Sequence, residues 1–324
     1  MILEVTGLRV EFPSRHGNLV ALDGVSFSIA PGEVLGVVGE SGAGKSVTGL
    51  AVIGLLDPPG RIAGGEIRLE GRRIDDLGPE ALRRLRGRRI GMVFQDPLTS
   101  LNPLYTIGRQ LEETILAHLY VSRPESRKRA ISLLGETGIP APEERLHHFP
   151  HQFSGGMRQR VVIALALAAE PSLVIADEPT TALDVSIQAQ IIALLRRIAR
   201  TRGTAVMLIT HDMGVIAETA DRVAVMYAGR LVEIGAVREV LHSPRHPYTA
   251  GLMGSIPKIG ASRKHKLVQI DGAMPRLGAI PAGCAFHPRC TSRLPRCSAE
   301  RPELLDAGST LAACWLHVPD AGRV

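Results

Sequence analysis

The feature that most constrains this chain is a glycine-rich loop set between an apolar run and a helical pattern. The continuous apolar run Val34–Val38 leads into Gly39-Glu-Ser-Gly-Ala-Gly-Lys45-Ser46, and a helical pattern continues through Leu55. Such a run is typical of a buried parallel strand, and a strand, a loop of this spacing and a helix together form a P-loop. Its backbone N–H groups and the helix N-terminus favour phosphate. The predicted nucleotide-binding residues are Gly39, Glu40, Ser41, Gly42, Ala43, Gly44, Lys45 and Ser46.

Two carboxylates end a second apolar run. Asp177 and Glu178 directly follow Leu173-Val-Ile-Ala. A carboxylate at the tip of a parallel strand beside a P-loop can hold Mg²⁺, which we assign to Asp177 together with the Ser46 hydroxyl, while Lys45 reaches the β- and γ-phosphates. Glu178 is placed to accept a proton from the attacking water. The sequence therefore predicts an ATPase that uses magnesium. The alternative is that Asp177 and Glu178 only cap a helix before Pro179.

A third motif, Ser154-Gly155-Gly156, precedes a long helical stretch with apolar residues on one face. Alone it reads as an ordinary serine N-cap followed by two glycines. Beside a P-loop, the same helix N-terminus can clamp a γ-phosphate. Since one chain is not expected to fold both clamps onto one nucleotide, we expect two ATPase chains to sandwich two nucleotides head to tail.

Two single residues, His211 and Gln95, are candidates only because the three motifs above are present. His211 follows the apolar run Val206–Thr210, where an imidazole can bond the γ-phosphate and sense its loss, although a histidine at a strand end is more often structural. Gln95 follows Ile90–Phe94 and could ligate magnesium or its water. We include both among the candidate catalytic residues.

The amino-acid composition limits the classes of partner that the chain is expected to bind. The 324 residues carry a formal net charge of +6, but the arginines are spread along the chain and aromatic residues make up only 3%. Base-stacking platforms require more aromatic side chains, so we expect no nucleic-acid partner. No apolar run reaches the roughly 18 residues of a membrane-spanning helix, and the N-terminus lacks the pattern of a secretory signal. We expect a cytoplasmic chain that meets a membrane only through partners.

The pattern along the chain predicts an α/β fold with a mixed sheet and an inserted helical lobe. Periodicity is helical between Thr106 and Ala169, and the chain beyond Pro257 is rich in Pro, Gly, Arg and Cys. The predicted division is an ATPase domain at 1–256, with a helical subdomain at about 98–170, and a small accessory domain at 257–324. Strand-like runs are expected at Leu8–Phe12, Val25–Ile29, Val34–Val38, Glu66–Leu69, Ile90–Phe94, Leu173–Ala176, Ala205–Thr210 and Val223–Met226.

All four cysteines lie near the end of the chain, at Cys284, Cys290, Cys297 and Cys314. A cytosolic protein does not usually keep stable disulfides, so an even number of clustered cysteines suggests a metal site. The short C-x2-4-C knuckle of zinc sites is absent, and four thiolates without close pairs suit a [4Fe–4S] cluster better. A zinc site and unliganded thiols remain the alternatives.

Taken together, these motifs closely resemble the ATP-binding subunits of ABC transporters. In that resemblance Phe12 stacks on adenine, Gln95 is the Q-loop, Asp177-Glu178 is the Walker B motif and His211 is the switch histidine. The remaining matches are Gly39–Ser46 as Walker A, Phe153–Arg160 as the signature, and Ala182-Leu183-Asp184 as the D-loop. The fold it implies is an ABC-type P-loop ATPase core with an inserted helical subdomain plus a small cysteine-containing C-terminal domain.

Longer segments resemble the dipeptide/oligopeptide permease ATPases, with the D-type subunit as the nearest match. They are Gln95-Asp-Pro-Leu-Thr-Ser-Leu-Asn102-Pro, Pro150-His-Gln-Phe-Ser-Gly-Gly and Pro244-Arg-His246-Pro247-Tyr248-Thr. This resemblance implies a bacterial importer at the cytoplasmic face of the inner membrane. Its other parts are a second ATPase in a heterodimer, two permeases and an extracytoplasmic peptide-binding protein. It also places a [4Fe–4S] cluster on the four C-terminal cysteines.

Three alternatives stay open. The same subfamily includes nickel and glutathione importers, so the solute could be other than a peptide. Soluble ABC ATPases act on ribosomes or DNA, but they usually carry two cassettes or a long coiled coil, which this chain lacks. A non-catalytic regulatory module is disfavoured by the presence of Glu178 and His211.

Overall fold

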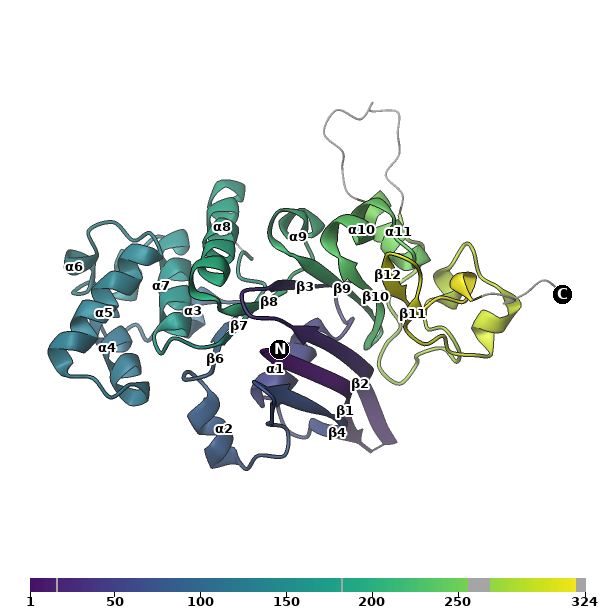
Figure 1. Cartoon of the computed structure of the whole chain (residues 1–324), viewed down its shortest axis with the longest axis horizontal. Helices are drawn as coiled ribbons and strands as arrows, with labels where there is room; N and C mark the ends of the chain where they lie inside the picture. Colours follow the sequence, from purple (N-terminus) through teal and green to yellow (C-terminus); the bar gives the residue numbers. More distant parts are fainter. Residues whose placement is uncertain (16, 182, 256–268, 319–324) are drawn as a thin grey trace. The chain divides into compact units, whose positions relative to one another are not determined.

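The computed structural model describes residues 1–15, 17–181, 183–255 and 269–318 (Figure 1). The contacts divide the chain into two compact units. The first comprises residues 1–3, 28–34 and 68–209, and the second comprises 4–27, 35–67 and 210–324. This division by contacts differs from the predicted boundary at 256/257, which lies outside the described residues and stays a prediction.

The first unit contains three buried parallel strands. Strand β7 pairs in parallel with β6 on one side and with β8 on the other. Every residue of β7 and β8 is buried, which explains why both read as continuous apolar runs. The strands of this unit are β5 (Arg72–Arg73), β6 (Ile90–Val93), β7 (Leu173–Asp177) and β8 (Ala205–Ile209).

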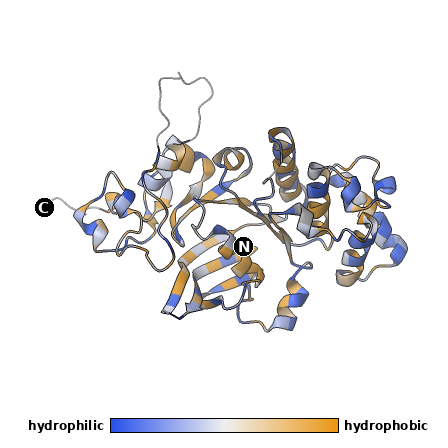
Figure 2. Ribbon diagram, turned by 180° about the vertical axis from the view of Figure 1, so that it is seen from behind, coloured by the Kyte–Doolittle hydropathy of each residue, from blue (hydrophilic) through white to orange (hydrophobic). Residues whose placement is uncertain are grey.

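A helical lobe interrupts the strands of the first unit between β6 and β7. Helices α4, α5 and α7 contact one another, α5 also contacts α6, and Figure 1 shows these helices gathered in teal. In Figure 2 the ribbon of the lobe carries many hydrophilic residues. The helices of this unit are α2 (Pro79–Leu85), α3 (Pro97–Ser100), α4 (Ile107–His118), α5 (Arg123–Glu136), α6 (Pro142–Arg145), α7 (Gly155–Leu167) and α8 (Val185–Arg202), with a 3-10 turn at Pro150–Gln152. The predicted helical block at 106–169 is confirmed.

The second unit is built on strand β3 (Val34–Val38), whose five residues are all buried. Strand β3 pairs in parallel with β9 (Arg222–Tyr227), which pairs antiparallel with β10 (Arg230–Ala236). The strands β2 (Gly17–Ile29), β1 (Leu3–Ser14) and β4 (Arg61–Leu69) are neighbours in a separate sheet. The helices are α1 (Lys45–Ile53), α9 (Met213–Thr219), α10 (Val237–His242) and α11 (Pro247–Gly254).

The C-terminal residues extend the sheet of the second unit. Strand β12 (Thr310–Ala312) pairs antiparallel with β10 and also with β11 (Leu305–Asp306). The fully buried Glu233 of β10 joins these parts, because its carboxylate accepts hydrogen bonds from the backbone N–H groups of Arg245 and His246 and from the hydroxyl of Thr310. Short 3-10 turns lie at His287–Arg289, Pro295–Ser298 and Trp315–His317. A separate accessory domain is therefore not confirmed.

The predicted strands are present, but β1, β2 and β4 begin five to eight residues earlier than the predicted runs. The run Val34–Val38 coincides with β3, and Ala205–Thr210 exceeds β8 by one residue. The sequence prediction missed β10, in which Leu231–Ile234 are buried, Gly235 is half-buried and Ala236 is exposed. Within the ranges that the structure describes, no helix has the length and apolar character needed to cross a membrane.

Candidate ATP site

The P-loop lies between β3 and α1, as predicted. Its glycines are required for steric reasons: a Cβ atom on Gly39 would lie 2.3 Å from the carbonyl oxygen of Met226, and Gly44 has φ 102. That left-handed conformation is easily adopted only by glycine. Gly44 is the N-cap of α1, and no side chain caps this helix. The loop thus brings a helix N-terminus and closely spaced backbone groups together, the arrangement that binds phosphate.

Lys45 is the first residue of α1 and is nearly buried, with 7% of its surface exposed. Its ammonium donates hydrogen bonds to the carbonyl oxygens of Gly39 at 2.8 Å and of Glu40 at 3.1 Å. These bonds hold the charged end of Lys45 within the curve of the loop. A cation at this place stabilises the charge of bound phosphates.

The carboxylates of the predicted Walker B motif lie in the first unit, where β7 ends. Asp177 is the last residue of β7 and is 8% exposed. Glu178 follows with φ 47, a left-handed conformation uncommon for a residue other than glycine. Its backbone N–H donates to the carbonyl of Ile209, the last residue of β8. The turn therefore fixes the direction of the Glu178 side chain relative to two buried strands.

The structure brings Gln95 and Glu178 together, although 83 positions separate them. The side-chain amide of Gln95 donates to a carboxylate oxygen of Glu178 at 2.9 Å. The hydroxyl of Thr181 donates to the same oxygen at 3.0 Å. A carboxylate held in this way can orient a water molecule and take its proton. Sequence reasoning missed Thr181; its spacing of three residues after Glu178 was the signal available.

The signature motif begins α7. Ser154 is the N-cap, and its hydroxyl accepts a hydrogen bond from the backbone N–H of Met157 at 3.3 Å. Ser154 and Gly155 are exposed. A Cβ atom on Gly156 would lie 2.6 Å from a methyl carbon of Ile187 in α8, so the two helices approach closely at this glycine. The motif thus presents an exposed helix N-terminus on a well-packed helix.

The other predicted residues are placed individually. His211 follows β8 and is exposed, and Asp184 is the N-cap of α8, accepting a hydrogen bond from the backbone N–H of Ile187. Phe12 is half-buried in β1, and a Cβ atom on Gly60 would meet its ring at 2.6 Å. Ala182, part of the predicted D-loop, lies outside the described residues. The roles of all these residues stay predictions.

The four cysteines lie in the second unit. Burial raises the pKa values of Cys284 and Cys290, and raises that of Cys314 to about 11, and in each case nearby thiols add to the shift. The backbone N–H groups of Phe286, Ser292 and Leu316 bond to these three sulfurs and act in the opposite direction, and Leu294 donates to the sulfur of Cys297 at 3.4 Å. Among the residues described, no group of three or more His, Cys, Asp or Glu side chains is arranged to hold a metal ion.

Comparison with known proteins matches two parts of the chain. Residues 22–181 match the family "ABC transporter", and residues 232–297 match "Oligopeptide/dipeptide transporter, C-terminal region". The chain is 47% identical to the oligopeptide transport ATP-binding protein OppD of Bacillus subtilis, with 100% of this chain and 91% of that protein covered. The chain belongs to the ABC transporter ATP-binding family. As a member of this family it is an ATPase.

Two further likenesses support the family assignment. The dipeptide transport ATP-binding protein DppD of Escherichia coli is 46% identical, with 99% of this chain and 98% of that protein covered. A solved structure described as the dimeric, post-hydrolysis state of the ATP-binding cassette MJ0796 bound to ADP and Pi has a TM-score of 0.64 and 32% identity. It covers 73% of this chain and 99% of that one. The ABC ATPase fold predicted for the core is therefore confirmed.

Proposed function

We propose that this chain is the ATP-hydrolysing subunit of a bacterial importer for oligopeptides or dipeptides. The observation that carries this proposal is the likeness, at 46–47% identity over nearly the whole chain, to proteins named for oligopeptide and dipeptide transport. The match of residues 232–297 to the C-terminal region of such transporters supports the same substrate class. The nickel, glutathione and ribosome- or DNA-directed alternatives receive no support from these names.

The proposed mechanism assigns one task to each group of residues. The P-loop, with Lys45, binds the phosphates of ATP, and Ser46 and Asp177 hold Mg²⁺ when it is bound. Glu178, oriented by Gln95 and Thr181, takes the proton of the attacking water. His211 contacts the γ-phosphate, so its loss on hydrolysis changes the contacts of the loop that follows β8.

The proposed assembly contains a second, related ATPase that contributes its own signature motif to the ATP held by this chain. Ser154 and Gly155 at the start of α7, which are exposed, would take the reciprocal role. Two permease subunits would contact the segment after Gln95, where the side chain of Leu104 is 80% exposed. An extracytoplasmic binding protein would deliver the peptide. This chain would lie at the cytoplasmic face of the membrane.

A native pull-down tests this assembly. The full chain would be isolated from bacterial membranes in mild detergent and its partners identified by mass spectrometry. We expect two multi-span permeases and a second ABC ATPase, and peptide uptake in vesicles that contain the purified complex. Recovery of ribosomal or DNA-associated proteins, with no membrane partner, would reject the importer and favour a soluble ATPase.

We further propose that the four cysteines hold a structural [4Fe–4S] cluster, with zinc as the alternative. One observation supports the proposal: each of the four sulfurs accepts a hydrogen bond from a backbone N–H group, although the described residues do not bring three metal-ligating side chains together. Such bonds stabilise thiolates, the form that ligates iron. Iron and zinc would be measured in the full chain and in each single Cys→Ser variant. We expect iron to fall in all four; unchanged iron in every variant would reject the cluster.

A further inference from the structure

Glu40, the second residue of the P-loop, is bound through three of its groups. Its backbone N–H donates to the hydroxyl of Tyr248 at 2.9 Å. Its carboxylate accepts a hydrogen bond from the guanidinium of Arg289 at 3.1 Å, and its carbonyl oxygen accepts one from the ammonium of Lys45 at 3.1 Å. Tyr248 and Arg289 lie 208 and 249 positions further along the chain. The C-terminal part of the second unit therefore reaches directly into the phosphate-binding loop.

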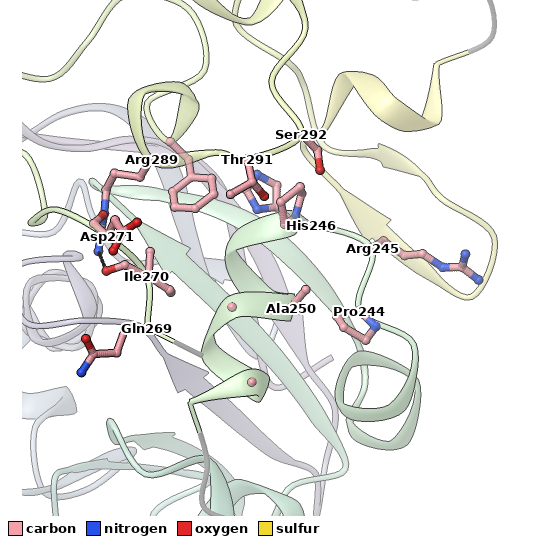
Figure 3. Close-up of a pocket in the computed structure, with 14 residues that line it drawn as sticks. Pro244, Arg245, His246, Ala250, Gln269, Ile270, Asp271, Arg289, Thr291 and Ser292 are labelled. Carbon is pink, nitrogen blue, oxygen red and sulfur yellow. Dashed lines mark hydrogen bonds between the residues drawn. The ribbon is translucent and has the colours of Figure 1, made fainter. Parts of the chain in front are cut away.

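Hydrogen bonds to several groups hold the guanidinium of Arg289 in place. Its side chain is only 8% exposed. Besides Glu40, its guanidinium donates to the backbone carbonyls of Ile270, Asp271 and Gly272 and to the hydroxyl of Tyr227. Figure 3 shows Arg289 beside Ile270 and Asp271, where it lines a cavity of about 430 Å³. A planar guanidinium with its donors satisfied in this way holds its partners in one geometry.

Tyr248 is a second rigid anchor. Its side chain is fully buried in α11, and its ring meets that of Tyr227 edge-on with centroids 4.7 Å apart. The ring of Phe286 lies against both tyrosines. Burial raises the pKa of Tyr248, so its hydroxyl stays neutral and able to accept the hydrogen bond of Glu40. Aromatic side chains packed like this have few alternative rotamers, so the hydroxyl position is well defined.

Residues just before the cysteines also approach the loop. A Cβ atom placed on Gly42 would lie 3.9 Å from the side chain of Met274. This contact is independent of Glu40 and occurs at a different residue of the same loop. The C-terminal segment therefore follows the P-loop over at least two of its positions.

We infer that Arg289 and Tyr248 are positioning residues for ATP binding, and that they act by holding Glu40 where its carbonyl receives the ammonium of Lys45. The guanidinium of Arg289 also neutralises the negative charge of the Glu40 carboxylate, which lies in the phosphate-binding loop. Loss of Arg289 would leave the Glu40 carboxylate without this partner, at a cost below that of a fully buried pair because the Glu40 side chain is 28% exposed. This inference rests on ATP binding at the P-loop and does not depend on the cluster or the importer assembly.

Nucleotide affinity of the full chain tests the inference. Binding of a fluorescent ATP analogue with Mg²⁺ would be titrated for the parent chain, Arg289→Gln, Glu40→Gln, the double variant and Tyr248→Phe. We expect about tenfold weaker binding for Arg289→Gln and about threefold for Glu40→Gln and Tyr248→Phe. The double variant should bind better than Arg289→Gln alone, because it removes the unpaired carboxylate. Arg289→Lys should recover part of the loss, because it restores the charge.

Arg296→Gln is the matched control. Arg296 stacks 3.6 Å over the ring of Trp315 and pairs with Glu300, so its loss perturbs the same part of the chain without touching the P-loop. We expect unchanged affinity for this variant. Equal affinity of the parent chain and Arg289→Gln, or an equal loss in Arg296→Gln, would overturn the inference. A parent chain that binds no better than Lys45→Ala would instead reject ATP binding itself.

Discussion

The N-termini of α1 and α7 are both proposed to bind ATP, but they are built differently. Helix α1 starts from Gly44 in a left-handed conformation, without a side-chain cap, and its first residue is the nearly buried Lys45. Helix α7 starts from Ser154 in an extended conformation, and the serine hydroxyl accepts the backbone N–H of Met157.

The difference indicates how each helix start is used. In the proposed function the first helix start binds the ATP of its own chain, and its shape is fixed by glycine and by the contacts of Lys45 with the loop. The second is an exposed, self-capped helix that is stable before any ligand arrives, as expected if the ATP comes from another chain. Four substitutions test the difference between these helix starts.

The largest effect is expected for Glu178→Gln, which leaves both helix starts intact. Glutamine keeps the size of the side chain but cannot take a proton, so turnover of the assembled transporter should fall about 1000-fold while ATP remains bound. ATPase rate and retained nucleotide would be measured on the same sample. The exposed Glu170, paired with Arg129, offers Glu170→Gln as the control. Turnover above one tenth of the parent rate would reject the assigned role.

Gly44→Ala should destroy the first helix start. A Cβ atom there would lie 2.8 Å from a methyl carbon of Leu22, and φ 102 is strained for alanine. We expect about 100-fold weaker ATP binding in titrations of the full chain. Gly71 also has a left-handed φ but meets nothing within 4 Å, so Gly71→Ala separates backbone strain from the P-loop. Equal losses in both variants would contradict this prediction.

Ser154→Ala should affect the second helix start alone. Loss of the cap costs about 1 kcal/mol of unfolding free energy, and the missing hydroxyl should lower turnover of the transporter about tenfold. Affinity of the isolated chain for ATP should not change. Ser122 caps α5 in the same way, so Ser122→Ala matches the loss of stability without the loss of turnover. Weaker ATP binding in the isolated Ser154→Ala chain would show that the two starts are not separate.

The smallest expected effect is on the pH dependence of the unfolding free energy, and it arises at the start of a third helix, α11. The ring of His246 accepts the backbone N–H of Tyr248, and burial, with a smaller contribution from the nearby His317, lowers the pKa of His246 to about 3. The carboxylate of Glu233 accepts the backbone N–H of His246. Since the folded pKa lies below the unfolded value of about 6.5, only the unfolded chain gains a proton as the pH falls between these values.

The unfolding free energy should therefore fall by about 1.0 kcal/mol between pH 6.5 and 5.5 through His246 alone, because the unfolded imidazole is already half protonated at pH 6.5. Asparagine can cap a helix without titrating, so His246→Asn should lose this part of the pH dependence in urea unfolding at the two pH values. His242→Asn, at an exposed histidine nearby, should follow the parent chain. A parent-like pH dependence in His246→Asn would contradict the prediction.

Sequence reasoning recovered the parts of the fold that depend on local patterns. The buried strands β3, β7 and β8 read as apolar runs, and the motifs at their ends follow at fixed distances, so Lys45, Asp177, Glu178 and His211 could all be placed. The hydrogen bond of Gln95 to Glu178 joins residues 83 positions apart and was not predicted.

The contacts of the C-terminal residues with the P-loop could not be predicted from local sequence patterns. Tyr248 was part of a recognised segment but without a role, and Arg289 stands among many arginines. Their bonds to Glu40 join polar groups that are more than 200 positions apart, and such pairs produce no periodicity. The strand β10 was missed for a different reason: Arg230, Glu233 and Gly235 interrupt its apolar run, although its partner β9 directly precedes it in the chain.

The bond between Arg289 and Glu40 bears on how freely relatives can exchange parts. A chimaera that joined the ATPase core of one transporter to the C-terminal segment of another would inherit positions 40 and 289 from different parents. Where the acidic and basic partners no longer matched, the graft would fold around an unbalanced charge beside the nucleotide. These two positions would therefore have to be transplanted together.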